Sequence, residues 1–317
     1  MKFIKWIIVL VFLMGILLLS VGFFLGADVL AVFNNDEDYG DLLVYTFEEK
    51  PEVIELDFDY RHTYIHLHDE AYVEIQYRQK DDDTWVFNEQ ANRLSVSQRQ
   101  PSTWFSFGLR RPSRAKMEVH VFLPSDVLYD LDIHTNVGSI YVEFESNFAL
   151  KNLNVSSDVG TIRVTHAQVN DDFELSTSTG SARLNDVIGD VLSVNVSVGS
   201  IEINRSSFND LNLRTSTGSI DVKLSTVAGD LKAQTSTGSI KLDRAEAADY
   251  DLKTSTGSIE LLLVDLSRFY YDLETSTGAI HIGTVNQGQR HQTQQTVNQT
   301  IRIKAVLSTG SIDVKEA

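Results

Sequence analysis

Apolar and polar positions alternate within a unit of about twenty residues that recurs nine times along the chain. The clearest copy runs from Leu211 to Val222 and reads L-N-L-R-T-S-T-G-S-I-D-V. Its glycine recurs at spacings of 22, 20, 19, 19, 20, 19, 21 and 32 residues. The repeat glycines are Gly138, Gly160, Gly180, Gly199, Gly218, Gly238, Gly257, Gly278 and Gly310. A period near twenty residues predicts a stacked-repeat architecture.

The residues after each glycine predict a short strand. The second residue after the glycine is isoleucine in eight copies and Ala182 in the ninth, and the fourth is Val, Leu or Ile in all nine. The residue between them is polar and varies freely, for example Arg183, Glu202 and Lys241. Apolar residues at every second position indicate a strand with one buried face.

The residues before each glycine predict a second strand. Leu211 and Leu213 are followed by two positions, three and one before the glycine, where valine or leucine exchanges with threonine. We expect both positions to face inward, with threonine hydroxyls hydrogen-bonded from coil to coil. The residue between them is always small and polar, as in Asn136, Asp158 and Ser216, and should face outward.

Together these patterns predict an all-β fold, a single-stranded parallel β-solenoid (β-helix) with coils of about 20 residues, preceded by one N-terminal transmembrane helix. Residues 51–125 should form an irregular N-terminal β region and cap, because their strands alternate without the glycine signature. Residues 126–317 should form the regular coils. The polar insertion 284–300 should leave the solenoid as a loop before a final coil.

The N-terminal segment predicts a membrane anchor, residues 1–26, followed by an acidic tether, residues 27–50. Trp6 to Leu25 contains no charge, and Lys2 and Lys5 precede it. Such a run spans a bilayer as a helix, and the positive flank places the N-terminus in the cytoplasm and the solenoid outside. The predicted location is therefore the cell membrane, with a single pass through the bilayer at residues 6–25. A cleaved signal peptide ending near Ala27–Ala31 is the alternative.

A basic and aromatic segment, residues 99–116, stands out in a chain of net charge −17. It has no acidic residue, and its candidate contact residues are Trp104, Phe105, Phe107, Arg110, Arg111 and Arg114. One interpretation is a loop whose aromatic side chains enter a membrane interface or partner groove while its arginines bind phosphates or carboxylates. The other is a hairpin that covers the open core of the first coils.

Composition and motifs limit the partners and the kinds of site that the chain can have. The net charge makes nucleic acid an improbable partner, and the absence of cysteine excludes disulfides and thiol chemistry. His66 and His68 alternate on one predicted strand and are a weak metal-site candidate, since such histidines more often face solvent. We therefore predict no cofactor, no metal and no catalytic residue.

The T-S-T-G-S-I rungs, with Val121-Phe122-Leu123-Pro124 before them, resemble those of a bacterial putative-adhesin family of unknown function, the LiaG-like envelope proteins. The resemblance covers roughly Pro51 to Ala317. It implies a solenoid displayed outside a bacterial membrane. It implies no activity, because the family has no established catalytic residues to carry over.

The function predicted is that of a membrane-anchored extracytoplasmic module that acts by binding, as an adhesin-like or envelope-stress accessory protein without catalysis. Its partner would be a membrane protein or an envelope polymer. The alternative is a carbohydrate-active or polysaccharide-binding β-helix protein. A third class, an ordered-water or ice-binding surface of stacked Thr-x-Thr pairs, is disfavoured because both threonine positions are expected to face inward.

Overall fold

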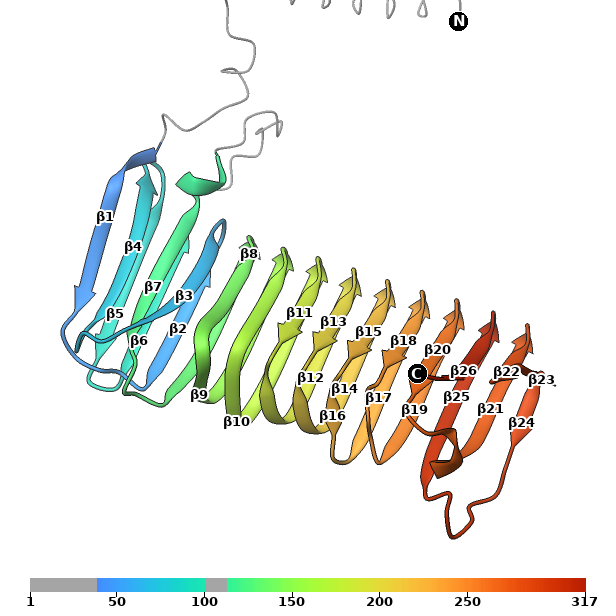
Figure 1. Cartoon of the computed structure of the whole chain (residues 1–317). Helices are drawn as coiled ribbons and strands as arrows, with labels where there is room; N and C mark the ends of the chain where they lie inside the picture. The colour runs from blue at the N-terminus through green and yellow to red at the C-terminus, as the bar shows by residue number, and fades with distance from the viewer. Residues whose placement is uncertain (1–38, 101–112) are drawn as a thin grey trace, which may run out of the picture.

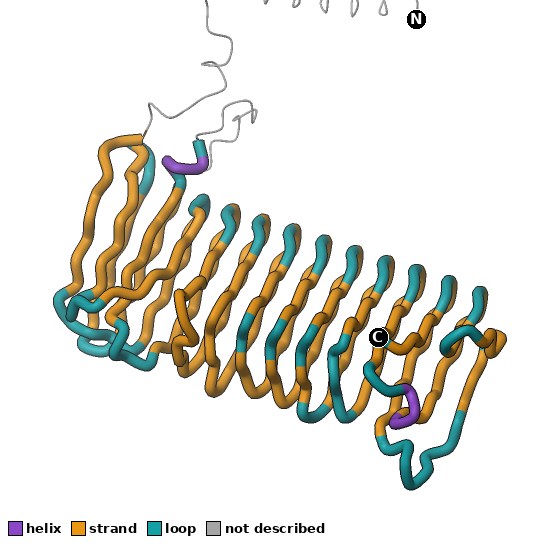
Figure 2. The backbone as a smooth tube through the Cα atoms, in the orientation of Figure 1, coloured by secondary structure: helices purple, strands orange, loops and turns teal. Residues whose placement is uncertain are grey.

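The structure is a computed structural model that describes residues 39–100 and 113–317, in which the chain winds into a long solenoid (Figure 1). The strands form two faces, joined at one side by the glycine corners and at the other by a second set of corners (Figure 2). The helical residues of the described chain are two short 3-10 turns, η3 (Arg114–Lys116) and η4 (Leu266–Arg268). The all-β solenoid predicted from the repeats is therefore confirmed.

The first face consists of the strands that precede the glycine corners, with the C-terminal parts of β9 and β10. Neighbouring strands are parallel except at the two ends, where β5 and β24 are antiparallel to their neighbours. In spatial order, the strands are β5 (Thr84–Gln90), β6 (Arg93–Arg99), β2 (Val53–Phe58), β8 (Tyr129–Val137), β9 (Ile140–Val159), β10 (Ile162–Thr179), β12 (Ile188–Val198), β14 (Ser207–Thr217), β17 (Asp230–Thr237), β19 (Asp249–Thr256), β25 (Ile301–Thr309), β21 (Phe269–Thr277) and β24 (Arg290–Gln292); the short β16 (Thr226–Val227) pairs with the start of β14.

The second face consists of the strands that follow the corners, with the N-terminal parts of β9 and β10. Its outer strands β1, β4 and β23 pair antiparallel, and the others are parallel. In spatial order, they are β1 (Tyr39–Phe47), β4 (Val73–Lys80), β7 (Glu118–Pro124), β3 (His62–His68), β9, β10, β11 (Ala182–Asn185), β13 (Ile201–Asn204), β15 (Ile220–Lys223), β18 (Ile240–Asp243), β20 (Ile259–Leu263), β26 (Ile312–Glu316), β22 (Ile280–Ile282) and β23 (Val285–Gly288).

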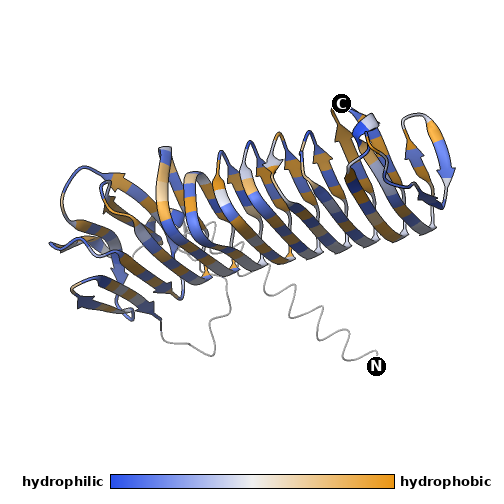
Figure 3. Ribbon diagram, turned by 90° about the horizontal axis from the view of Figure 1, so that it is seen from below, coloured by the Kyte–Doolittle hydropathy of each residue, from blue (hydrophilic) through white to orange (hydrophobic). Residues whose placement is uncertain are grey.

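The core lies between the two faces and follows the predicted alternation. Leu211 and Leu213 of the first face and Ile220 and Val222 of the second are at most 1% exposed. Hydrophobic and hydrophilic residues alternate along the strands (Figure 3). Because each coil exposes its apolar edge to the next, burial is continuous along the solenoid axis.

The glycine corners bring neighbouring coils into backbone contact. Gly218 has φ 148° and donates its N–H to the carbonyl of Thr237 at 2.9 Å. A Cβ at position 218 would lie 1.9 Å from the carbonyl oxygen of Gly199, closer than any side chain can approach. The same overlap with backbone recurs at the other repeat glycines, so each needs the space that glycine leaves, and all except Gly160 also have a positive φ that favours glycine.

The second corner begins at a residue that is not glycine but has a left-handed backbone. Arg205, Leu224 and Arg244 have φ values of 49°, 50° and 50°. This conformation is uncommon for side-chain-bearing residues. Hydrogen bonds between coils hold it, since the Leu224 N–H donates to the Asp243 carbonyl at 2.9 Å.

The order of the last coils differs from the order in the sequence. Strands β25 and β26 were expected to form the terminal coil, but they lie between the coil of β19 and β20 and the coil of β21 and β22. Gly310 accordingly lies between Gly257 and Gly278. The insertion 284–300, expected as a free loop, supplies β23 and β24, which pair antiparallel with the outermost coil and cover its edge.

At the N-terminal end of the solenoid, a buried ion pair joins the cap to the first coils. The Arg61 guanidinium contacts the Asp83 carboxylate, and both side chains are fully buried. Gln98 Nε2 donates to the other Asp83 oxygen at 3.1 Å, and the Arg61 guanidinium lies 5.3 Å from the centre of the Trp85 ring. Asp83 belongs to the turn between β4 and β5, so the pair ties this turn to the corner before β3.

Aromatic side chains form a stacked ladder on the outer side of the second face. The Tyr64 ring stacks between His120 and Tyr141, with ring centres 4.8 and 4.7 Å apart. His66 lies beside it, its Nε2 2.9 Å from His120 Nδ1. Burial, with a smaller contribution from His120, lowers the pKa of His66.

No helix in residues 39–100 and 113–317 is long and apolar enough to span a bilayer. The predicted anchor at residues 6–25 lies outside this range.

The glycine contact predicts a large loss of stability from one added methyl group. Gly218→Ala should cost about 1–3 kcal/mol from backbone strain, with the overlap on Gly199 in addition. Gly40→Ala is the matched control, because its Cβ would lie an ordinary 3.6 Å from the Gln79 oxygen. Urea denaturation measures both variants, and equal stability would show that the corners do not need glycine.

The histidine pair predicts a loss of stability on acidification. A histidine whose pKa is lowered by folding binds a proton more readily in the unfolded chain, so stability should fall as the pH drops below the ordinary value of about 6.5. His66→Phe keeps a ring to stack on Phe122 and should reduce this fall. Melting temperatures measured at several pH values from roughly 7.5 to 5, the range in which histidine changes charge, test this prediction, with His291→Phe as the control. An unchanged pH profile in His66→Phe would contradict it.

Candidate functional site

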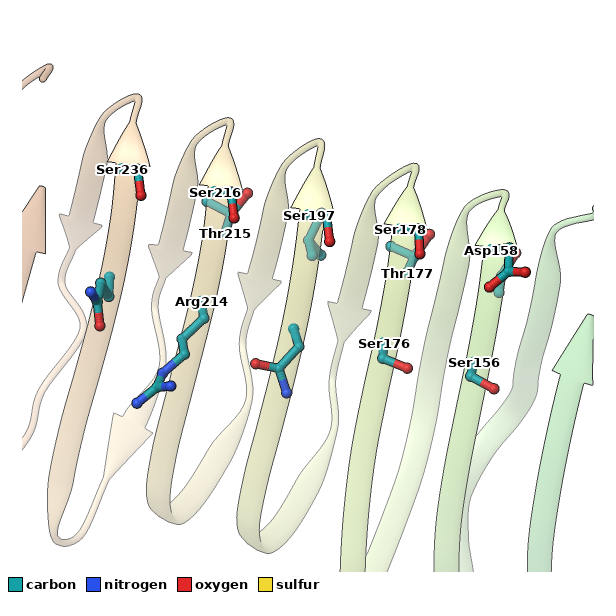
Figure 4. A pocket seen from close by; sticks show the side chains of 14 residues that line it. Ser156, Asp158, Ser176, Thr177, Ser178, Ser197, Arg214, Thr215, Ser216 and Ser236 are labelled. Carbon is teal, nitrogen blue, oxygen red and sulfur yellow. The ribbon is translucent and has the colours of Figure 1, made fainter. Parts of the chain in front are cut away.

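A shallow polar groove crosses five consecutive coils on the outer side of the first face (Figure 4). Its volume is about 390 Å³. It runs along the solenoid axis just before the glycine corners. Its lining residues are Ser156, Ser157, Asp158, Ser176, Thr177, Ser178, Asn195, Val196, Ser197, Arg214, Thr215, Ser216, Gln234 and Ser236.

Two rows of side chains form the groove, each with one member per coil. The residues four before each glycine stand opposite one another in the parallel register. This first row is Ser156, Ser176, Asn195, Arg214 and Gln234. The residues two before each glycine are smaller and make up the second row: Asp158, Ser178, Ser197, Ser216 and Ser236. Each row repeats its polar groups at the coil spacing of about 4.8 Å.

The floor between the rows is buried, and its hydroxyls are already used. Thr215 Oγ1 donates to the Gly199 carbonyl at 3.0 Å, and Thr177 Oγ1 donates to the Gly160 carbonyl at 3.2 Å. The same bond recurs at Ser157, Thr235, Thr254 and Thr275. The predicted inward threonine ladder is therefore confirmed at the position three before the glycine.

The threonine position one before the glycine was wrongly expected to face inward. Thr217 is exposed, and Val159 and Val198 in the same column are 48% and 51% exposed. The residue two before the glycine has no partner in the parallel register, which passes from Thr215 directly to Thr217. Alternation is broken there, and two successive side chains face solvent. Each Thr-x-Thr pair thus exposes one threonine, so a surface of paired threonines does not form.

The groove carries hydroxyl and amide groups and little charge. Arg214 and Asp158 are the charged side chains among its lining residues. At one end His134 extends the first row, with Nδ1 2.8 Å from Ser156 Oγ and Nε2 3.0 Å from Asn136 Oδ1. Such a surface can donate and accept hydrogen bonds to an extended, hydroxyl-rich ligand.

Most of the contact residues predicted from the sequence lie outside the described residues. These are Trp104, Phe105, Phe107, Arg110 and Arg111. Arg114 is described, and it is engaged with the aromatic ladder: it donates to the hydroxyls of Tyr64 and Tyr141, and its guanidinium lies 5.2 Å from the centre of the Tyr141 ring.

The histidines considered as metal ligands point to different partners. His66 pairs with His120, whereas His68 Nε2 lies 2.7 Å from the Tyr72 carbonyl oxygen. Within residues 39–100 and 113–317, no three His, Cys, Asp or Glu side chains are grouped as a metal site requires. The pairing with His120 depends on the spatial order of β3 and β7, which the sequence does not reveal.

The sequence pattern does not predict the groove. The small polar column two before the glycine was recognised as outward, but the row four before it varies too much in residue type to suggest a site. Only the register of the coils shows that both rows line one surface.

Comparison with proteins of curated function finds no match to the chain. Among solved structures, a putative adhesin from Bacteroides fragilis is 12% identical, with a TM-score of 0.45, over 87% of this chain and 98% of that one. A putative lipid binding protein from Parabacteroides distasonis is 13% identical, with a TM-score of 0.44, over 87% and 97%. A putative cell adhesion protein from Clostridium sporogenes is 12% identical, with a TM-score of 0.20, over 87% and 100%. These values are too low to transfer a function to this chain.

A match between the chain and a protein-family model confirms the family inferred from the T-S-T-G-S-I rungs. The family model described as Toastrack DUF4097 matches residues 52–315. This range contains all nine repeat glycines and every described strand except β1, with the last residue of β26 just outside it. The chain belongs to the Toastrack DUF4097 family.

Proposed function

We propose that the protein is a membrane-anchored, extracytoplasmic binding module, adhesin-like in its action, that holds an extended hydroxyl-rich polymer on its first face. The observation that carries this proposal is the groove across five coils, with its two rows of hydroxyl and amide side chains. A polysaccharide of the cell envelope has the matching chemistry, since it repeats hydroxyl groups along an extended chain.

The groove supports binding by many weak contacts. A net hydrogen bond contributes about 0.5–1.5 kcal/mol, so one coil would hold a ligand only weakly. Five coils at about 4.8 Å each offer such contacts over about 20 Å. Affinity should therefore grow with the length of the bound polymer until the groove is filled.

The same groove gives little support to hydrolysis. Glycoside hydrolysis commonly uses two carboxyl groups about 5–9.5 Å apart on either side of the bond. The lining of the groove has one carboxylate, Asp158. We therefore propose a binding role without catalysis.

The proposed anchor is the uncharged segment Trp6 to Leu25, which would hold the module on the outer side of the membrane. The acidic tether expected at residues 27–50 would link it to the solenoid, but the tether is shorter than expected, because Tyr39–Phe47 form strand β1 and pair with β4. The described chain begins at Tyr39, in the edge strand at one end of the solenoid (Figure 1). The groove begins several coils farther along the axis, away from this end of the solenoid.

Blocking the groove should abolish polymer binding. Ser197→Trp places a bulky ring in the middle of the second row, whereas Ser207→Trp makes the same change at an exposed position outside the groove. Full-length protein in nanodiscs is tested for retention of envelope polysaccharides, with neutral glucans and uronate-containing polymers as separate probes. We expect loss of binding in Ser197→Trp alone. Equal retention by both variants would refute the groove as the binding surface.

The segment 99–116 remains a second candidate contact because of where it departs from the solenoid. The Gln100 N–H donates to Asp59 Oδ2 at 2.8 Å. Arg61 follows Asp59 by two residues, and its guanidinium lies 5.5 Å from the centre of the Tyr39 ring. The basic and aromatic segment thus starts at the corner where the described chain begins. We propose that Trp104, Phe105, Phe107, Arg110 and Arg111 contact the membrane surface or a membrane protein there.

Charge reversal tests this second contact. Arg110→Glu with Arg111→Glu should remove crosslinks between the full-length protein and a partner in the native membrane, because the arginines would no longer pair with anionic groups. Lys151→Glu with Arg290→Glu is the control, with the same change of charge at exposed positions far from this corner. Identical crosslinks in both variants would reject the assignment.

A further inference from the structure

A second pocket, unrelated to the polar groove, opens at the other set of corners near the C-terminal end. Its volume is about 370 Å³, within the range of about 300–1,000 Å³ for small-molecule sites. It is bounded by three stretches of chain: the corners before β17 and β19, the connection from β20 to β21, and the start of β25.

A column of interior side chains beside the pocket shrinks from coil to coil. Phe208 fills this column in one coil, Val227 stands opposite it in the next, and Ala247 follows in the third. The three side chains become progressively smaller, and in the third coil the Tyr250 side chain reaches the same corner, where its hydroxyl is hydrogen-bonded to the backbone of Ala245 and Ala247.

The altered order of the coils completes the pocket. After β20, which ends at Leu263, the chain passes through η4 into β21, which lies one coil beyond the position next to β19 and β20. The position that it skips is filled later by Ile301 and the rest of β25. The pocket lies where the skipping connection crosses the incoming strand, and both Phe269 and Ile301 line it.

The floor of the pocket is apolar and largely buried. Val227, Ala245, Ala247, Leu263 and Phe269 are at most 6% exposed. The Tyr250 hydroxyl fixes the alanine corner, since it donates to the Ala245 carbonyl and accepts from the Ala247 N–H, both at 2.8 Å. The floor therefore offers apolar contact without a free hydrogen-bonding group from this tyrosine.

The rim carries two arginines. Arg244 Nε donates to Asp243 Oδ1 at 3.0 Å, and Arg268 is exposed at the end of η4. The rim also carries Glu246 and Asp265. The Asp265 carboxylate accepts hydrogen bonds from the backbone N–H and hydroxyl of Ser267, at 2.9 and 2.6 Å. These bonds, with a smaller contribution from the charge of Arg268, lower the pKa of Asp265, and the Arg268 side chain is exposed beside it.

We propose that this pocket binds a single-chain amphiphile, whose aliphatic chain packs against Ala247 and Phe269 and whose anionic head group pairs with Arg244 and Arg268. The apolar floor excludes a sugar as the preferred occupant, because hydroxyl groups buried there would lose their hydrogen bonds to water. The two arginines favour a carboxylate or phosphate over a neutral head group. This site is independent of the proposed polymer-binding role of the first face.

The first test uses a diazirine-bearing fatty acid as the probe on full-length protein in its native membrane vesicles. After irradiation, we expect labelled peptides from residues 226–250 and 263–269, and we expect unlabelled fatty acid to suppress the labelling. A lysophospholipid of the same chain length and the corresponding fatty alcohol are separate competitors, which distinguish a carboxylate, a phosphate and a neutral head group. Labelling that no competitor suppresses, or that falls elsewhere in the solenoid, would overturn the proposal.

The second test fills the pocket. Ala247→Phe adds a phenyl ring to the floor of the pocket, and we expect loss of the competable labelling in a folded protein. Ala149→Phe makes the same change at an exposed corner residue outside the pocket and should label as the natural protein does. Arg268→Gln should keep the labelling but lose the preference for the fatty acid over the alcohol. Undiminished labelling in a folded Ala247→Phe variant would overturn the proposal. If that variant does not fold, suppression by competitors in the natural protein decides.

Discussion

The close backbone contact between glycine corners is the constraint on which the rest of the structure depends. Each repeat glycine leaves room for a backbone carbonyl of the neighbouring coil, which belongs to Arg61 at Gly138 and to another repeat glycine at the rest. A Cβ at Gly218 would lie only 1.9 Å from the Gly199 oxygen. This contact fixes the register of every coil. It also places the Thr215 hydroxyl where it can donate to the Gly199 carbonyl. Side chains four and two before the glycine are thereby aligned into the two rows that form the groove.

Coils held together in this way can be placed out of sequence order. Because the corner around Gly310 has the same shape as its neighbours, its coil fits between those of Gly257 and Gly278. This order also covers the edge of the outermost coil. The residues between β22 and β25 supply the antiparallel strands β23 and β24, which pair with that coil. The amphiphile pocket is a product of the same route, since it lies where the skipping connection crosses β25.

The sequence predicts the coils well because their signal is local. Leu211 and Ile220 are core residues by simple alternation, and both are fully buried. Thr217 was misplaced because the strand departs from alternation one residue earlier, a backbone change with no signature in residue type. The pairs Arg61 with Asp83 and His66 with His120 join segments 22 and 54 residues apart. Such contacts, like the groove and the second pocket, follow from the spatial order of coils, and identical repeats do not encode that order.

The most direct measurement of the central claim, polymer binding in the groove, is a cysteine-protection experiment. The chain has no cysteine, so single cysteines can be placed at Ser178, Ser197 and Ser216 in the groove and at Glu202, Asp221 and Lys241 on the opposite face. Thiol modification of full-length protein in nanodiscs is timed with and without envelope polysaccharide. We predict slower modification at all three groove positions together and no change on the opposite face. Equal rates with and without polymer at the groove positions, or protection confined to the opposite face, would contradict the account.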